Sequence, residues 1–209
     1  DRYYLFQKIN KIKIIDGSLK GLNYLHNEAG ILHRDIKPQN ILLGENLSTK
    51  DGVRLDAKLC DFGVSEKLEA PFQENDKITK TAGTYHFFPP ECCDCHTDNF
   101  SGMAVDVWSL GATLYCMIFN ELPFWDSENC ENEFSILEYI LKNEVVVPQD
   151  TKRIVVNDKE YEQHQDDELY VSEALIAVMF RMLDKDSATR ITVGGCLAEV
   201  DKIMKKSEK

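Results

Sequence analysis

Residues 33–40 read His-Arg-Asp-Ile-Lys-Pro-Gln-Asn, and the apolar run Ile-Leu-Leu follows them at 41–43. The stretch brings an acid, a cation and an amide within six positions of one another. A second short element, Asp-Phe-Gly at 61–63, follows after a segment rich in polar residues and glycine. Side chains spaced in this way cannot all face one side of a helix, so a loop is predicted. Pro38 favours that loop because proline has no backbone N–H to donate.

These two elements resemble the catalytic loop and the magnesium loop of eukaryotic Ser/Thr protein kinases. The resemblance implies that Asp35 orients the substrate hydroxyl and accepts its proton, while Lys37 neutralises charge on the transferred phosphate. It also implies that Asn40 and Asp61 hold Mg²⁺, which prefers oxygen ligands, and that Leu42 lies under the adenine of ATP. A lysine two residues after Asp35 is typical of enzymes that phosphorylate Ser and Thr rather than Tyr.

The same resemblance assigns supporting roles to residues that align the active site. Asp106, in an otherwise apolar stretch, is expected to accept hydrogen bonds from the backbone of the catalytic loop, because a buried carboxylate needs such partners. Arg190 is expected to form a buried ion pair with Glu91, and Thr84 is expected to contribute to substrate docking. The other supporting residues are His33, Arg34, Phe62 and Gly63.

The composition describes an acidic chain. With 209 residues it is long enough for one domain with a sizeable core. Its formal charge of −12 disfavours nucleic acid or an anionic membrane as the main partner. The charge is compatible with basic peptide substrates, although acidic surfaces more often serve only solubility.

Cysteine content and hydropathy bear on the cellular compartment. Seven cysteines, an odd number without the spacing of a disulfide framework, indicate reduced thiols. No run of 18 apolar residues predicts a membrane span. The first residues lack the basic-then-apolar order of a signal peptide. We therefore expect an intracellular protein, located in the cytoplasm.

The first half of the chain predicts one helix and two strands. Apolar residues recur every three or four positions over 9–25, which predicts an amphipathic helix. It should end near Gly30, a residue that suits a left-handed C-cap. The ranges 41–43 and 57–60 predict two short strands beside the active site. Residues 44–56 between them predict an enlarged polar turn.

The second half predicts further helices, so the fold is expected to be mainly α with a few short strands. Residues 105–119 are apolar on nearly every side and predict a buried helix. Another helix should end near Asn143, and Ser172 is a predicted N-cap for a helix over 174–183. The apolar residues that predict the helix before Asn143 are Phe134, Leu137 and Leu141.

The resemblance covers residues 8–200 but only the C-terminal half of a kinase domain. Residues 1–7 are aromatic and β-prone, and we expect them to be a remnant of the N-terminal lobe or hinge. Residues 201–209 form a lysine-rich tail that is expected to fray. The chain shows no Gly-rich loop and no strand lysine. We therefore expect residues 1–209 to be a C-terminal lobe that transfers little phosphate without its N-terminal lobe.

Several motifs narrow the kinase group. Val-Asp-Val-Trp-Ser-Leu-Gly at 105–111 and Thr-Leu-Tyr-Cys at 113–116 most resemble the calmodulin-dependent kinase kinases. Pro-Pro-Glu at 89–91 is similar to the liver kinase that shares their targets. The resemblance implies ATP and Mg²⁺ as cofactors and a protein with Ser or Thr as substrate. The sequence leaves open whether calmodulin or another regulator is a partner. Such a regulator would bind through segments outside this chain.

By the same resemblance, residues 63–91 form the activation segment. Tyr85 stands where proline is common, and Pro89 replaces alanine. Many Ser/Thr kinases carry a phosphorylatable Thr three residues before the glycine that corresponds to Gly83. Lys80 occupies that position here. We therefore expect a working conformation without phosphorylation, with control left to segments outside this chain.

Two other interpretations stay open from the sequence. One is a pseudokinase or kinase-derived protein-binding module, although degenerate kinases usually lose one of the polar residues that are all present here. The other is a metal-binding module at residues 92–96, Cys-Cys-Asp-Cys-His, whose thiolate and imidazole groups suit zinc. Those ligands are crowded for one tetrahedron and no second cysteine pair follows, so ordinary thiols are favoured.

Overall fold

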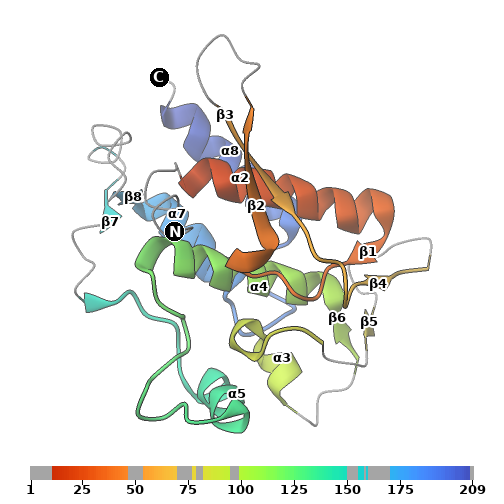
Figure 1. Cartoon of the computed structure of the whole chain (residues 1–209). Helices are drawn as coiled ribbons and strands as arrows, with labels where there is room; N and C mark the ends of the chain where they lie inside the picture. The colour runs from red at the N-terminus through yellow and green to blue at the C-terminus, as the bar shows by residue number, and fades with distance from the viewer. Residues whose placement is uncertain are drawn as a thin grey trace.

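The computed structural model describes residues 11–46, 54–69, 77–78, 82–94, 99–149, 155–157, 159 and 170–207 of the chain. Helices supply most of the regular structure in these ranges, and all the strands described there form two-stranded sheets (Figure 1). This helix-rich architecture agrees with the predicted kinase-like fold. Residues 1–7, the expected remnant of an N-terminal lobe, lie outside the described ranges.

The first described helix confirms the amphipathic pattern. Helix α2 (Lys11–Tyr24) continues into a π-helical turn, η1 (Leu25–Ala29). Gly30 ends it in the left-handed conformation, with φ 62°, and its N–H donates to the Leu25 carbonyl. Glycine populates this region without the steric penalty of a Cβ, so the predicted C-cap forms.

A hairpin lies directly on α2 (Figure 1). Strands β2 (Ile41–Asn46) and β3 (Arg54–Leu59) are antiparallel, and Ile41 pairs with Leu59. Both strands are longer than the predicted 41–43 and 57–60, so much of the predicted polar turn is strand instead. Antiparallel pairing satisfies backbone groups whatever the side chains are, which lets polar residues continue the ladder.

Helix α4 (Gly102–Phe119) is the centre of the core. Ser101 caps it by accepting a hydrogen bond from the Ala104 N–H at 3.3 Å, and Asn120 ends it with φ 59°. The helix is the one described helix long and apolar enough to cross a membrane, but 83% of it is buried inside the molecule. Its apolar composition therefore fits the buried helix that was predicted.

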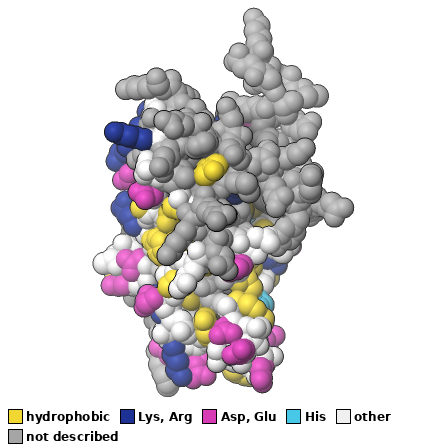
Figure 2. Space-filling model, turned by 90° about the vertical axis from the view of Figure 1, so that its left-hand side faces the viewer, with side chains coloured by type: hydrophobic (Ala, Val, Ile, Leu, Met, Phe, Trp, Pro, Cys, Tyr) yellow, Lys and Arg dark blue, Asp and Glu magenta, His cyan; other side chains and the backbone are white. Residues whose placement is uncertain are grey.

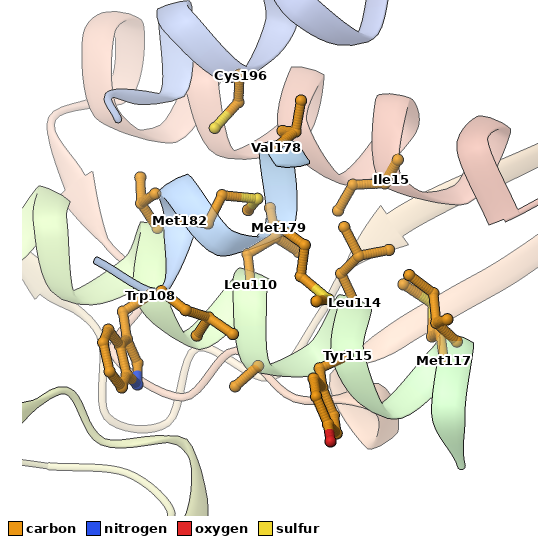
Figure 3. Packing of buried hydrophobic residues seen from close by; sticks show 14 of the residues in the cluster. Ile15, Trp108, Leu110, Leu114, Tyr115, Met117, Val178, Met179, Met182 and Cys196 are labelled. Carbon is orange, nitrogen blue, oxygen red and sulfur yellow. The ribbon is translucent and has the colours of Figure 1, made fainter. Parts of the chain in front are cut away.

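Helices α2, α7 and α8 pack around α4 or one another. Figure 3 shows side chains of these helices meeting in one cluster, with Leu110 and Leu114 of α4 near Met179 of α7. Helix α7 (Glu173–Met182) begins after Ser172, whose hydroxyl accepts from the Leu175 N–H at 3.2 Å, as the N-cap prediction required.

The C-terminal tail differs from its prediction. Helix α8 (Val193–Ser207) includes residues 201–207, which were expected to fray. Val200 and Ile203 are buried in the core, so the last turns are held by packing. Lys205 also pairs with Asp201 one turn earlier, a spacing that supports helices.

The remaining short strands join distant parts of the chain. The strand pairs are β1 (Ile31–Leu32) with β4 (Glu66–Lys67), β5 (Lys77–Ile78) with β6 (Phe100–Ser101), and β7 (Val155–Val156) with β8 (Val171–Ser172). The β7–β8 pair is parallel and the other two are antiparallel. Through β1 and β4, the chain before residue 33 lies beside the chain after residue 63.

Helix α5 (Glu133–Lys142) forms where a helix was predicted, but it buries a different face. A capping box between Asn132 and Ser135 fixes its start. Ile136 and Ile140 are buried, whereas Phe134 is 83% exposed and Leu141 42% exposed. Two apolar stripes fit the same helical period here, and the sequence pattern had picked out the outer one.

Adjacent residues of α5 test this orientation. We expect Ile140→Ala to lower the free energy of unfolding by about 2–5 kcal/mol, because it leaves a cavity at a fully buried position. Leu141→Ala, one residue away and partly exposed, should lower it by much less. Urea unfolding followed by circular dichroism measures both variants, and a larger loss at Leu141 would contradict the orientation.

Candidate active site

The buried carboxylate of Asp106 holds the start of the loop at 33–40. Its oxygens accept hydrogen bonds from the backbone N–H of His33 at 2.8 Å and of Arg34 at 2.7 Å. The Nε2 atom of His26, from η1, lies 2.8 Å from the same carboxylate. Arg34 has φ 69°, a conformation that non-glycine residues rarely adopt. The expected contact of Asp106 with the loop is therefore present, and it supports an unfavourable turn.

Three side chains meet around the Asp35 carboxylate. Lys37 Nζ lies 2.7 Å from Asp35 Oδ2 and donates to Thr84 Oγ1 at 2.9 Å. The Thr84 hydroxyl donates in turn to Asp35 Oδ1 at 2.7 Å. Asn40 Nδ2 donates to the Asp35 backbone carbonyl at 2.8 Å and to its Oδ2 at 3.2 Å. The sequence-predicted catalytic pair and the predicted docking residue thus form one closed network.

This network keeps Asp35 charged. Partial burial alone would raise the pKa of its carboxyl, but hydrogen bonds from Lys37, Thr84 and Asn40, with the Lys37 charge, outweigh it and lower the pKa below the usual value. Asp35 is therefore ionised throughout the neutral pH range. An ionised carboxylate can accept a hydrogen bond from a hydroxyl placed beside it.

The segment 60–63 is tied to the same loop. The Cys60 N–H donates to the Asn40 carbonyl at 3.0 Å, just after the 3₁₀ turn η2 (Pro38–Asn40). The His33 ring nitrogen Nε2 lies 3.0 Å from the Cys60 carbonyl, and the His33 ring packs against Phe62 at 5.1 Å. The two motifs are therefore neighbours in space, and His33 and Phe62 link them by packing.

Asp61 itself sits on the surface of this segment. It adopts φ 66°, and its Oδ1 accepts a hydrogen bond from the Gly63 N–H at 3.2 Å. Leu42, on β2, is 47% exposed and Phe62 is 45% exposed. Asp61 thus presents an exposed carboxylate in a region with apolar side chains at the surface.

Arg34 has a partner that was not predicted. Its guanidinium forms an ion pair with Glu66 on β4. Gly83 also approaches this part of the loop, with φ 119°, and a Cβ there would collide with the Arg34 carbonyl oxygen. His26 bonds Asp106 and Glu66 bonds Arg34, but no local pattern marks either residue in the sequence.

The pair of Arg190 with Glu91 forms as expected and is almost completely buried. Nη1 and Nη2 of Arg190 bond the two carboxylate oxygens of Glu91 at 2.6 and 2.9 Å. The same guanidinium donates to the backbone carbonyls of Ala104 and Asp184, and it lies 5.0 Å above the Trp108 ring. Arg190 therefore joins helix α4 and the backbone at Asp184 to Glu91 in α3 (Pro90–Cys93).

Of the cysteine cluster at residues 92–96, the structure describes Cys92, Cys93 and Asp94. Burial raises the pKa of the Cys92 thiol strongly, and burial with the Glu91 charge raises that of Cys93 to about 12. Both side chains are therefore neutral thiols at neutral pH. No group of three or more metal-ligating side chains occurs among the described residues. Residues 95–96 and Lys80 lie outside them.

Comparison with known proteins identifies the family. Residues 2–201 match the protein kinase domain, so the chain belongs to the protein kinase family. The resemblance to eukaryotic Ser/Thr kinases is confirmed, because the curated relatives include several proteins of that kind.

Three relatives show the extent of the similarity. The Ser/Thr-protein kinase ELM1 of Saccharomyces cerevisiae is 38% identical over 149 residues, 64% of this chain and 22% of its own length. Par-4 of Caenorhabditis briggsae is 35% identical over 170 residues, 81% of this chain and 21% of its own. The calcium/calmodulin-dependent protein kinase kinase cmkC of Emericella nidulans is 39% identical over 174 residues, which are 82% of this chain and 26% of its own length. The chain thus spans between a fifth and about a quarter of these relatives.

The buried pair can be tested against a surface pair of the same chemistry. Glu91→Gln leaves the Arg190 charge uncompensated and should lower the free energy of unfolding by ~3–5 kcal/mol. Glu199→Gln removes the exposed partner of Arg181 and should have a far smaller effect. Urea unfolding of both variants compares them, and equal losses would contradict a structural role for Glu91.

Proposed function

We propose that this chain is the C-terminal lobe of a protein kinase that transfers the γ-phosphate of ATP to Ser or Thr hydroxyls of proteins. The observation that carries the proposal is the closed network of Asp35, Lys37 and Thr84. It places an ionised acceptor, a cation and a hydroxyl within hydrogen-bonding distance of one another. Phosphoryl transfer needs these elements because its catalysis is mostly positioning and charge stabilisation.

Asp35 would act mainly by orientation. Its lowered pKa makes it a weak base, since the most effective proton acceptors have a pKa near the working pH. Its carboxylate would hold the substrate hydroxyl in line for attack and take the proton late in the reaction. Lys37 would then stabilise the negative charge that develops on the transferred phosphoryl group.

Thr84 connects this chemistry to the substrate-binding segment. Its hydroxyl contacts both Asp35 and Lys37, so the segment after Gly83 is fixed relative to the catalytic loop. A peptide bound along residues 84–88 would therefore be held at a defined distance from Asp35. This is the basis for proposing Thr84 as a substrate-docking residue.

Asn40 and Asp61 fit the donor set that Mg²⁺ prefers. The Asn40 amide nitrogen is committed to Asp35, which leaves its carbonyl oxygen Oδ1 as a ligand atom. Asp61 offers an exposed carboxylate. Magnesium held there would neutralise charge on the phosphates of ATP. Leu42 would supply the apolar contact for the adenine ring.

The kinase group is also a proposal. The resemblance of residues 105–116 to calmodulin-dependent kinase kinases agrees with the presence of cmkC among the relatives. We propose that the protein acts intracellularly on other proteins, with calmodulin or another regulator binding outside this chain. The six cysteines of the described ranges are free thiols, which suits a reducing compartment.

Control without phosphorylation of the activation segment has structural support. In many kinases the arginine equivalent to Arg34 pairs with an added phosphate. Here Glu66 already supplies a carboxylate to that guanidinium. An internal ion pair would therefore hold the start of the activation segment, and Lys80 offers no hydroxyl to phosphorylate.

The role of Asp35 can be tested in a protein that joins this chain to an N-terminal kinase lobe. Asp35→Asn should lower kcat for a Ser/Thr peptide by about 10²–10⁴-fold, because the positioned acceptor is lost. Asp201→Asn, at an exposed position of α8, is the matched control and should retain activity. Radiolabelled phosphate transfer measures both, and undiminished turnover by Asp35→Asn would favour a pseudokinase or binding module.

Nucleotide binding tests the proposal that residues 1–209 form only one lobe of a kinase domain. The 209-residue chain alone should bind ATP with Mg²⁺ only weakly, since it carries no Gly-rich loop to cover the phosphates. Isothermal titration calorimetry measures the affinity. Low-micromolar binding by this chain would show that these residues suffice for the nucleotide site.

A further inference from the structure

The short turn that follows Thr84 is fixed to the core at its far end. Turn η3 (Tyr85–Phe87) begins after Thr84, whose backbone carbonyl accepts the Phe87 N–H at 2.9 Å. The Phe87 carbonyl accepts a hydrogen bond from the Ser109 hydroxyl of α4 at 2.9 Å, and the Phe87 side chain is buried. These contacts hold the end of η3 that lies away from Thr84. The end next to Thr84 is held by different residues.

Helix α5 contacts that end of the turn. The helix packs against η3, and the His86 ring lies against Trp125, in the loop before α5, with 5.3 Å between ring centroids. Tyr85 has its partner in the first turn of α5. A hydrogen bond to the Glu133 carboxylate and the negative charge of that group raise the pKa of the Tyr85 phenol. The phenol is therefore protonated at neutral pH and donates to Glu133.

The surroundings of Glu133 favour a neutral donor of this kind. Helix α5 lies at the lower end of the molecule in Figure 1, where Figure 2 shows several acidic side chains. The sequence from Thr81 to Leu141 contains no Lys or Arg. Glu133 thus accepts from the hydroxyl of Tyr85, because its own stretch of sequence offers no cation.

Glu133 is itself held in place. A capping box between Asn132 and Ser135 fixes the first turn of α5, with hydrogen bonds of 2.9 and 3.1 Å. Ile136 and Ile140 bury the inner side of the helix in the core. A hydrogen bond to this turn therefore fixes Tyr85 relative to the core.

Tyr85 can act on the proposed active site through its neighbour in sequence. Thr84 is extended, so the side chains of Thr84 and Tyr85 point to opposite sides of the backbone. The Thr84 hydroxyl donates to Asp35 and accepts from Lys37 on one side. The two residues share one planar peptide unit. A displacement of Tyr85 therefore moves the Thr84 hydroxyl relative to Asp35.

The identity of residue 85 makes this contact necessary. Proline is common at this position in kinases, and its ring fixes φ near −65°. Tyrosine leaves that rotation free, so the chain loses more conformational entropy when the segment becomes ordered. An interaction of the folded protein has to supply the restraint that a proline ring would give.

We propose that Tyr85 is a positioning residue, which holds η3 on α5 through Glu133 and so keeps the Thr84 hydroxyl on Asp35 and Lys37. The effect of Tyr85 on the reaction rate rests on the proposed phosphate transfer. Its effect on the backbone of η3 does not, and the two effects are measured separately.

Amide hydrogen exchange, followed by NMR, tests the restraint in the whole 209-residue chain without any need for activity. Tyr85→Phe removes the hydroxyl and keeps the ring that packs edge-on against Phe88. We expect the amides of Phe87 and Phe88 to exchange about fivefold faster or more, because a hydrogen bond to a charged group is lost and η3 opens more easily. Glu133→Ala should act alike, and Glu133→Gln, which keeps an acceptor oxygen, should have a smaller effect.

Tyr24→Phe is the matched control, because it removes the same atom from a tyrosine that is 61% exposed on α2. Its Phe87 and Phe88 amides should exchange as in the wild type. Thermal unfolding should show that all variants are folded, since each substitution lies at a partly or fully exposed position. Unchanged exchange at Phe87 and Phe88 in Tyr85→Phe would overturn the proposal.

A double-mutant cycle then tests whether Tyr85 acts through Thr84. In a protein that joins this chain to an N-terminal kinase lobe, Tyr85→Phe should lower kcat for a Ser/Thr peptide about threefold or more, because misplaced groups slow a reaction. Thr84→Val keeps the side-chain shape without the hydroxyl, and Tyr85→Phe should cause no further loss in that variant. Losses that multiply in the double variant would contradict the positioning role. Absence of transfer by the unsubstituted protein would contradict the proposed function instead, and the exchange rates would then decide the proposal alone.

Discussion

The arrangement of the site depends on one buried carboxylate. Asp106 lies on the central helix α4, fully inside the protein, where an unpaired charge would be strongly destabilising. Two backbone N–H groups of the loop at 33–40 and the His26 ring surround it. The loop satisfies the carboxylate, and the carboxylate in turn holds Arg34 in a left-handed conformation that would otherwise be unfavourable. Neither feature would be stable alone.

Similar polar contacts hold the other functional segments on the same apolar platform. Arg190 binds Glu91 across 99 positions of sequence, and Thr84 reaches Asp35 across 49. Such pairs add less net stability than their short distances suggest, because desolvation offsets much of the attraction. Their directionality selects one arrangement of the loops, whereas the packing around α4 supplies most of the stabilisation. The core therefore sets the fold, and the polar contacts set the geometry of the site.

The sequence predictions were confirmed where a feature depends on neighbouring residues, and they missed contacts between residues that are distant in sequence. The loop at 33–40, the glycine cap after η1 and the N-cap at Ser172 were predictable, because each depends on neighbouring residues. His26 and Glu66 were not, since only the folded chain brings them to Asp106 and Arg34. The buried face of α5 was missed for a different reason. Two apolar stripes share its helical period, and only tertiary packing decides which one faces inward.

The backbone at Thr84 joins the proposed active site to the start of helix α5. Thr84 is extended, with φ −104° and ψ 120°, and successive side chains of an extended segment point to opposite sides. Thr84 accordingly bonds Asp35, while Tyr85 bonds Glu133 at the start of α5. One short segment thus contacts the loop at 33–40 on one side and the first turn of α5 on the other.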